Sequence, residues 1–133
     1  MHNFQNLTIW QSAMDVAQIV YATTKKFPKE EMYALSSQMQ RAAVSIPSNI
    51  AEGAGRSTNK DFANFLAIAI GSCFELHTQI LLSERLKYIT AEQKEYLVSQ
   101  LNQLQPQIVS FKKKLESNNE VVQHPTTKCS NIN

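Results

Sequence analysis

Apolar residues recur at three- and four-residue intervals along most of the chain, which is the spacing of amphipathic helices. Four segments follow this pattern, over residues 8–26, 29–54, 58–86 and 90–116. Pro28 separates the first two segments, because the residue before a proline is pushed out of the α region. The pattern therefore predicts four long helices.

Several of the predicted helix ends carry capping residues. Thr58 stands three residues before Asp61 and is expected to cap the third helix. Thr90 and Gln93 have the spacing of a capping box at the start of the fourth. Gly53 and Gly55 are expected to end the second helix near Ala54.

Short connections between long helices imply that neighbouring helices run antiparallel. We therefore expect an all-α, up-and-down four-helix bundle. A chain of 133 residues fits one domain, which we place at residues 1–118. Residues 119–133 turn polar and are expected to form a flexible C-terminal tail.

The third segment is apolar on more than one side. One stripe along it consists of Phe62, Phe65, Leu66, Ala69, Cys73, Leu76 and Ile80. Ile70, Phe74 and Leu81 widen this stripe. A helix of that breadth is either central in its bundle or contacts a second subunit as well.

The second segment contains Pro47, followed by the polar pair Ser48 and Asn49. A proline inside a helix removes a backbone hydrogen bond and costs roughly 3 kcal/mol. Pro47 is expected either to kink the helix or to split it, with Ser48 or Asn49 capping the second piece. The kink is favoured, because one apolar stripe continues across the proline.

Composition narrows the class of protein. Hydrophobic residues make up 43% of the chain, and there are only 3 glycines and 4 prolines, which favours helices over strands and turns. The formal net charge of +2 is too small to indicate nucleic-acid binding without a concentrated basic face.

Cysteine usage and hydropathy predict the compartment. The two cysteines, Cys73 and Cys129, form neither a CxxC pair nor a metal-binding spacing, and fit a reducing cytoplasm. The first residues lack the pattern of a signal peptide. No uninterrupted apolar run reaches the roughly 18 residues of a membrane span, so we expect no membrane partner.

No residues have the spacing of a catalytic or metal centre. Glu75 and His77 are too close together for the Glu-x-x-His motif of a di-iron bundle, and no second such motif occurs. Cys73 lies on an apolar stripe, where a thiol behaves as a small hydrophobe. We therefore expect a protein that is not an enzyme and has no metal or other cofactor.

Basic residues are the remaining candidates for function. Arg41, Arg56 and Lys60 lie around the proline-containing helix and the turn after it. In an up-and-down bundle the second and fourth helices end at the same pole. Arg56 and Lys60 are therefore expected to share a pole with Lys112, Lys113 and Lys114. The alternative is that each cluster is simply the solvent-exposed end of a helix and binds no partner.

The chain resembles the small bacterial four-helix bundles known as 23S rRNA intervening sequence proteins, also called ribosomal-protein-like. The resemblance covers about residues 4–116. It rests on Trp10, Gln11, Ala13, Val20, Tyr21, Phe27, Pro28, Glu31, Leu35, Gln38, the run from Arg41 to Gly53, Arg56, Phe62, Phe65, Leu66, Gly71, Ser72, Glu75 and Leu76.

This resemblance implies a bundle that assembles as a ring-like homopentamer. It also implies a relation to the accessory protein of diversity-generating retroelements, a basic pentameric ring that binds nucleic acid and a reverse transcriptase. The chain departs from the family pattern at Gln40, where a second arginine is common, and at Ala34, where glycine is common.

Two functional hypotheses follow. The first is a homo-oligomeric bundle that binds RNA or DNA through Arg41, Arg56, Lys60 and Lys112 to Lys114, or that links nucleic acid to a reverse transcriptase or a ribosomal component. The second is a purely structural protein–protein module, in which Arg41 and Arg56 pair with carboxylates such as Glu52 or Glu75 across an interface.

Overall fold

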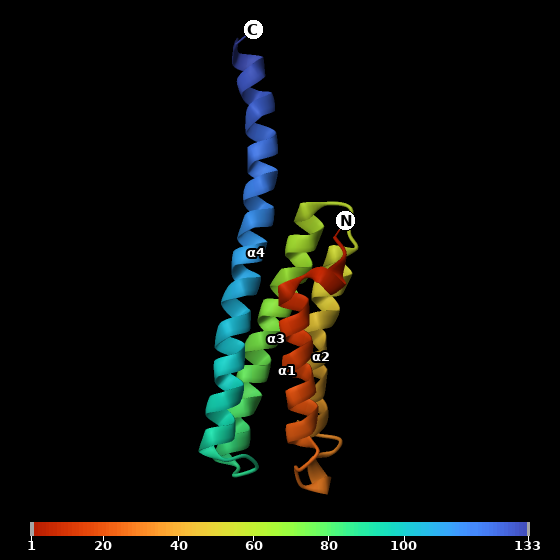
Figure 1. Cartoon of the computed structure of the whole chain (residues 1–133), viewed down its shortest axis with the longest axis vertical. Helices are drawn as coiled ribbons and strands as arrows, with labels where there is room; N and C mark the ends of the chain where they lie inside the picture. The colour runs from red at the N-terminus through yellow and green to blue at the C-terminus, as the bar shows by residue number, and fades with distance from the viewer. Residues whose placement is uncertain (1, 133) are drawn as a thin grey trace.

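The computed structural model describes the backbone of residues 2–132 and the side chains of residues 2–118. Its elements are η1 (Phe4–Asn6), α1 (Thr8–Thr24), η2 (Lys29–Glu31), α2 (Leu35–Ala54), α3 (Asn59–Arg85) and α4 (Ala91–Ile132). The four α-helices run up and down beside one another (Figure 1), and the described backbone contains no strand. The predicted all-α class with four helices is confirmed.

The start of α2 lies later in the chain than the sequence pattern predicts. A separate 3-10 turn, η2, occupies Lys29–Glu31, and Ala34 then takes φ −124° and ψ −108°, which is not a helical conformation. The backbone N–H of Leu35 donates to Glu31 Oε1 at 3.3 Å. The acidic residues after Pro28 therefore precede α2 instead of forming its first turn.

The predicted caps of α3 and α4 are confirmed. Thr58 Oγ1 accepts from the backbone N–H of Asp61 at 3.1 Å. At α4 the hydroxyl of Thr90 accepts from Gln93 N at 3.1 Å, while Gln93 Oε1 accepts from Thr90 N at 2.8 Å. Each reciprocal bond satisfies a backbone donor that the helix itself leaves free.

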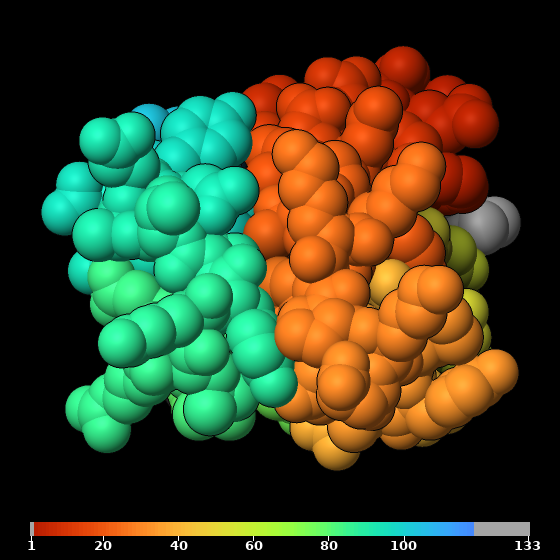
Figure 2. Space-filling view, turned by 90° about the horizontal axis from the view of Figure 1, so that it is seen from below, coloured from red at the N-terminus to blue at the C-terminus, as the bar shows by residue number. Residues whose placement is uncertain are grey.

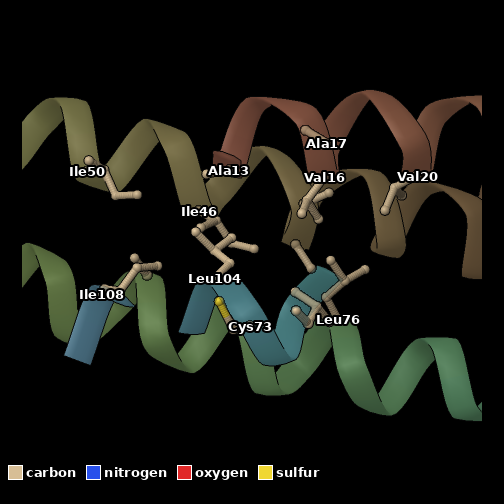
Figure 3. Packing of buried hydrophobic residues seen from close by; sticks show 14 of the residues in the cluster. Ala13, Val16, Ala17, Val20, Ile46, Ile50, Cys73, Leu76, Leu104 and Ile108 are labelled. Atoms are coloured by element: carbon tan, nitrogen blue, oxygen red, sulfur yellow. The ribbon is translucent and has the colours of Figure 1, made fainter. Parts of the chain in front are cut away.

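The helices contact one another around a square. α1 packs on α2 and α4, and α3 packs on α2 and α4, whereas the diagonal pairs make no comparable contact. Figure 3 shows apolar side chains from all four helices converging on the centre, among them Val16, Ile46, Leu76 and Leu104. Packing around this core determines which of the described side chains face outward.

Gly53 lies inside α2 and is buried, so its predicted role as a helix stop is wrong. A Cβ atom added there would lie 2.8 Å from Phe62 Cδ1, 2.8 Å from Phe65 Cβ and 3.2 Å from the Phe62 carbonyl oxygen. The missing side chain lets the end of α2 approach the start of α3. The helix ends at Ala54, as predicted, and Gly55 is its C-cap.

Pro47 is buried inside an unbroken α2. The helix is therefore not split at the proline, and neither Ser48 nor Asn49 caps a second piece. The kink at this position stays a prediction.

The lower pole is closed by contacts between the α1–α2 connection and the α3–α4 turn, which lie side by side in Figure 2. Tyr88 donates its hydroxyl to Glu31 Oε2 at 2.7 Å, and its ring lies 5.2 Å from that of Phe27. The hydrogen bond to the Glu31 carboxylate raises the pKa of Tyr88, with a smaller contribution from burial. This pole carries Lys25, Lys26 and Lys29.

Beyond the upper pole, α4 continues past the other helices (Figure 1). The helix runs on after Glu116, where the sequence pattern ends it. The side chains of residues 119–133 lie outside the described part of the chain. Their expected flexibility stays a prediction.

The length and composition of α3 are those of a helix able to cross a membrane. The core helix of a bundle meets the same criterion, and α3 packs against both α2 and α4. Only 33% of its most apolar window is buried. Much of its apolar surface therefore faces outward.

Gly53→Ala should destabilise the protein by about 1–3 kcal/mol, because the added methyl group meets backbone as well as side-chain atoms of α3. Gly71→Ala is the matched control. Nothing lies within 4 Å of its added Cβ, and replacing an exposed mid-helix glycine should stabilise by about 0.5–1 kcal/mol. Urea unfolding followed by circular dichroism measures both changes, and equal effects would refute the close approach at Gly53.

Candidate nucleic-acid interface

The upper pole collects basic residues from α3, from α4 and from the turn that joins α2 to α3. α2 ends there and α3 begins there, and the ring of Phe62 on α3 lies 5.4 Å from that of Phe111 on α4. This contact sets the lysines after Phe111 at the pole that holds Arg56 and Lys60. We call the set Arg56, Lys60, Lys112, Lys113 and Lys114 the basic pole. The bundle topology predicted this grouping.

The chain start docks at the basic pole, which the sequence did not indicate. The backbone N–H of His2 donates to the carbonyl of Ala54, the last residue of α2, at 3.0 Å. Its imidazole ring packs edge-on against Phe62 at 5.2 Å and Phe111 at 6.0 Å. No periodic pattern marks a residue this close to the chain start, so only the structure reveals the cluster.

Arg56 is held within its own subunit. Its guanidinium pairs with Glu52 Oε1 at 3.1 Å, one helical turn earlier, and lies 4.7 Å from the centroid of the Phe65 ring. Glu52 therefore pairs with Arg56 inside one subunit, not across an interface. An exposed pair of this kind contributes only about 0.3–0.5 kcal/mol to stability, so Arg56 remains accessible. The carboxylate of Glu52 offsets part of the positive charge of Arg56.

The lysines of the basic pole differ in their surroundings. Lys112 Nζ binds the Glu116 carboxylate at 3.1 Å. Lys60, Lys113 and Lys114 are exposed and make no ion pair with any described residue. These three lysines are the cations with the most freedom to contact an anionic ligand.

Arg41 does not belong to this group, so its predicted clustering with Arg56 and Lys60 is wrong. It lies in the lower half of α2, and roughly 22 Å of helix rise separates it from Arg56. Its exposed side chain lines the surface hollows on both sides of α2. Adjacency along the sequence suggested a cluster that the length of the helix pulls apart.

The polar residues around Pro47 join two helices. Asn49 donates through Nδ2 to the Ser45 carbonyl at 2.8 Å and to Ser45 Oγ at 3.0 Å. Ser45 Oγ lies 2.7 Å from Ser72 Oγ on α3, within hydrogen-bond distance. This arrangement fixes the level of α2 against α3. It gives Ser45 and Asn49 a structural role.

The described side chains contain no group of three or more His, Cys, Asp or Glu residues placed to hold a metal ion. Cys73 is buried in the core, and desolvation raises the pKa of its thiol from 9.0 to about 12. A thiol in that state is not a nucleophile at neutral pH. The surface chemistry therefore centres on charge and apolar area.

The chain is similar to known proteins in both sequence and fold. The profile of the 23S rRNA-intervening sequence protein family matches residues 5–110. A solved structure of a protein of unknown function from the S23 ribosomal protein family of Bacteroides thetaiotaomicron superposes with a TM-score of 0.74 at 26% sequence identity. The match covers 79% of this chain and 95% of that one. No curated protein matches the chain.

Cys73 should resist alkylation while the protein is folded. In a Cys129→Ser background at pH 8, the raised pKa lowers its thiolate fraction roughly a thousandfold relative to a free cysteine, and burial slows the reaction further. Mass spectrometry of iodoacetamide labelling, with and without urea, measures the ratio. Labelling of the folded chain at the rate seen in urea would contradict the buried position of Cys73.

Proposed function

Because the chain belongs to the 23S rRNA-intervening sequence protein family, we propose that it is a homo-oligomeric helical adaptor that binds structured RNA. The binding surface is the basic pole. The protein is not an enzyme and works without a cofactor, in the cytoplasm. DNA is the second nucleic acid that the same surface would take.

One observation carries this proposal: lysines from two helices converge at the basic pole. Lys60 lies in the first turn of α3. Lys113 and Lys114 lie on α4 close to Phe111, whose ring packs against Phe62. Phosphate contacts by lysine and arginine supply most of the sequence-independent affinity for nucleic acid. Three carboxylates offset part of the positive charge of the basic pole in each subunit: Asp61 and the partners of Arg56 and Lys112.

The affinity of the basic pole for RNA would rise if an oligomer repeated it. In a ring-like homo-oligomer, a pentamer by the family resemblance, each subunit would add one basic pole to the same rim. Several weak contacts on one RNA then act as a single multivalent site. Exposed large apolar side chains on α1, α2 and α3, such as Met14, Val44 and Phe74, support the formation of an oligomer.

Oligomers of this kind also suit an adaptor role. The family resemblance suggests a reverse transcriptase or a ribosomal component as the protein bound together with the RNA. The genes that neighbour this one would discriminate between these partners.

The alternative is a structural protein–protein module that does not bind nucleic acid. The ion pairs Arg56–Glu52 and Lys112–Glu116 favour it, because they neutralise part of the basic pole. In this reading the oligomer forms in the same way and the pole is an ordinary solvated end.

The combined change Lys60→Gln, Lys113→Gln and Lys114→Gln should weaken binding to a structured RNA by about an order of magnitude at low salt, because it removes three phosphate contacts per subunit. The slope of affinity against salt concentration should fall as well. Filter binding or fluorescence anisotropy at several salt concentrations measures both quantities.

The matched control changes Lys25, Lys26 and Lys29 to Gln at the opposite pole, with the same loss of charge. We expect this variant to keep most of the affinity. Equal loss in both variants would show that net charge alone drives binding. Wild-type binding that is absent or independent of salt would favour the structural module.

A further inference from the structure

A polar hollow lies on the side of the bundle, between α2 and α3. It has a volume of about 580 Å³. Its lining consists of Leu35, Gln38, Arg41, Glu75, Thr78, Gln79 and Leu82. We call it the α2/α3 hollow. Volumes of this size are typical of sites for small molecules, so the hollow has room for a ligand.

Hydrogen bonds between the two helices hold the walls of this hollow. On the side of the basic pole, Ser45 Oγ lies 2.7 Å from Ser72 Oγ. Nearer the lower pole, Ser83 Oγ donates to Met39 Sδ at 3.3 Å. α2 and α3 run antiparallel and pack side by side (Figure 1), so these two contacts fix the level of one helix against the other. The hollow is therefore formed before a ligand enters it.

Gln79 gives the hollow a hydrogen-bond acceptor that is not satisfied. The residue is only 8% exposed, and its Oε1 atom is buried without a hydrogen-bond partner among the described residues. Burying an amide oxygen without a donor is unfavourable. Because no hydrogen bond holds this oxygen, rotation of the terminal amide can turn it toward the hollow at little cost. A ligand with an N–H group would supply the missing donor.

A cation and an anion flank this amide. Arg41 on α2 and Glu75 on α3 are both exposed and line the hollow from facing helices. Arg41 lies one turn before Ser45, and Glu75 lies one turn after the partner of that serine, so both charges stand at the same level. They make no ion pair with each other or with any other described residue. Both charges are therefore available to one ligand.

These groups define the chemistry of the ligand. The guanidinium of Arg41 can bind a carboxylate through two parallel N–H···O bonds. The Glu75 carboxylate and Gln79 Oε1 can both accept from an ammonium group, which carries three N–H donors. Leu35 and Leu82 add apolar surface at the end of the hollow nearest the lower pole. A free α-amino acid with an apolar side chain combines a carboxylate, an ammonium and an apolar group.

We propose that the α2/α3 hollow binds such an amino acid, with the carboxylate on Arg41 and the ammonium on Glu75 and Gln79. The site lies on the side of the bundle, and roughly 22 Å of helix rise separates Arg41 from Arg56 at the basic pole. The inference therefore goes beyond the proposed RNA binding and does not depend on it. A ligand that bridges α2 and α3 also stabilises the folded chain by mass action.

Leucine is the probe, and an NMR titration of the full chain measures its affinity. We expect saturable binding with a Kd of about 1 mM. N-acetyl-leucine lacks the ammonium and leucinamide lacks the carboxylate, so each should bind about tenfold more weakly. Absence of leucine binding, or equal affinity for all three compounds, would overturn the proposal.

Two variants of exposed residues assign the ends of the ligand. Arg41→Gln should weaken leucine binding about tenfold and leave leucinamide binding unchanged, because leucinamide has no carboxylate to lose. Glu75→Gln should weaken leucine binding to a similar extent and leave N-acetyl-leucine unchanged. Glu95→Gln removes an exposed carboxylate of α4 outside the hollow and should keep the wild-type affinity. Wild-type affinity for leucine in both site variants would overturn the site.

Gln79→Met separates ligand binding from folding. Methionine has a similar length and leaves no amide oxygen without a partner. The variant should unfold at a higher temperature than the wild type, because the unsatisfied acceptor is gone, yet bind leucine about tenfold more weakly. Circular dichroism follows the thermal unfolding. A lower unfolding temperature together with wild-type leucine affinity would show that Gln79 serves packing alone, and would overturn its role in the site.

Discussion

The close approach of α2 and α3 is the constraint on which the rest of the structure depends. Gly53 removes the side chain that would separate them, and Ser45 and Ser72 join them farther down. The same approach places Phe62 against Phe111 and Phe65 beneath Arg56, so it builds the basic pole.

The stretch from Arg41 to Arg56 is consequently more structural than its polar residues suggest. Its interior residues pack α2 on α3, and Pro47 is tolerated in a buried, continuous helix. Its two arginines face different surfaces. Arg56 belongs to the basic pole proposed to meet RNA, and Arg41 lines the surface hollows on both sides of α2.

Periodicity and local chemistry were sufficient to predict part of the structure. The four helices, the caps at Thr58 and Thr90, and the shared pole of Lys60 and Lys113 follow from spacing and chain direction. The predictions were wrong or incomplete where contacts between helices determine the structure. Gly53 looks like a helix stop until Phe62 and Phe65 are seen against it. The docking of His2 and the separation of Arg41 from Arg56 likewise depend on distances in space.

Native mass spectrometry of the unmodified chain, alone and with a structured RNA at low salt, is the sharpest test of an oligomer that binds RNA. We expect a closed assembly of several chains, five by the family resemblance, that takes up RNA as one unit. A chain that stays monomeric at every concentration, and remains so when RNA is added, would contradict it.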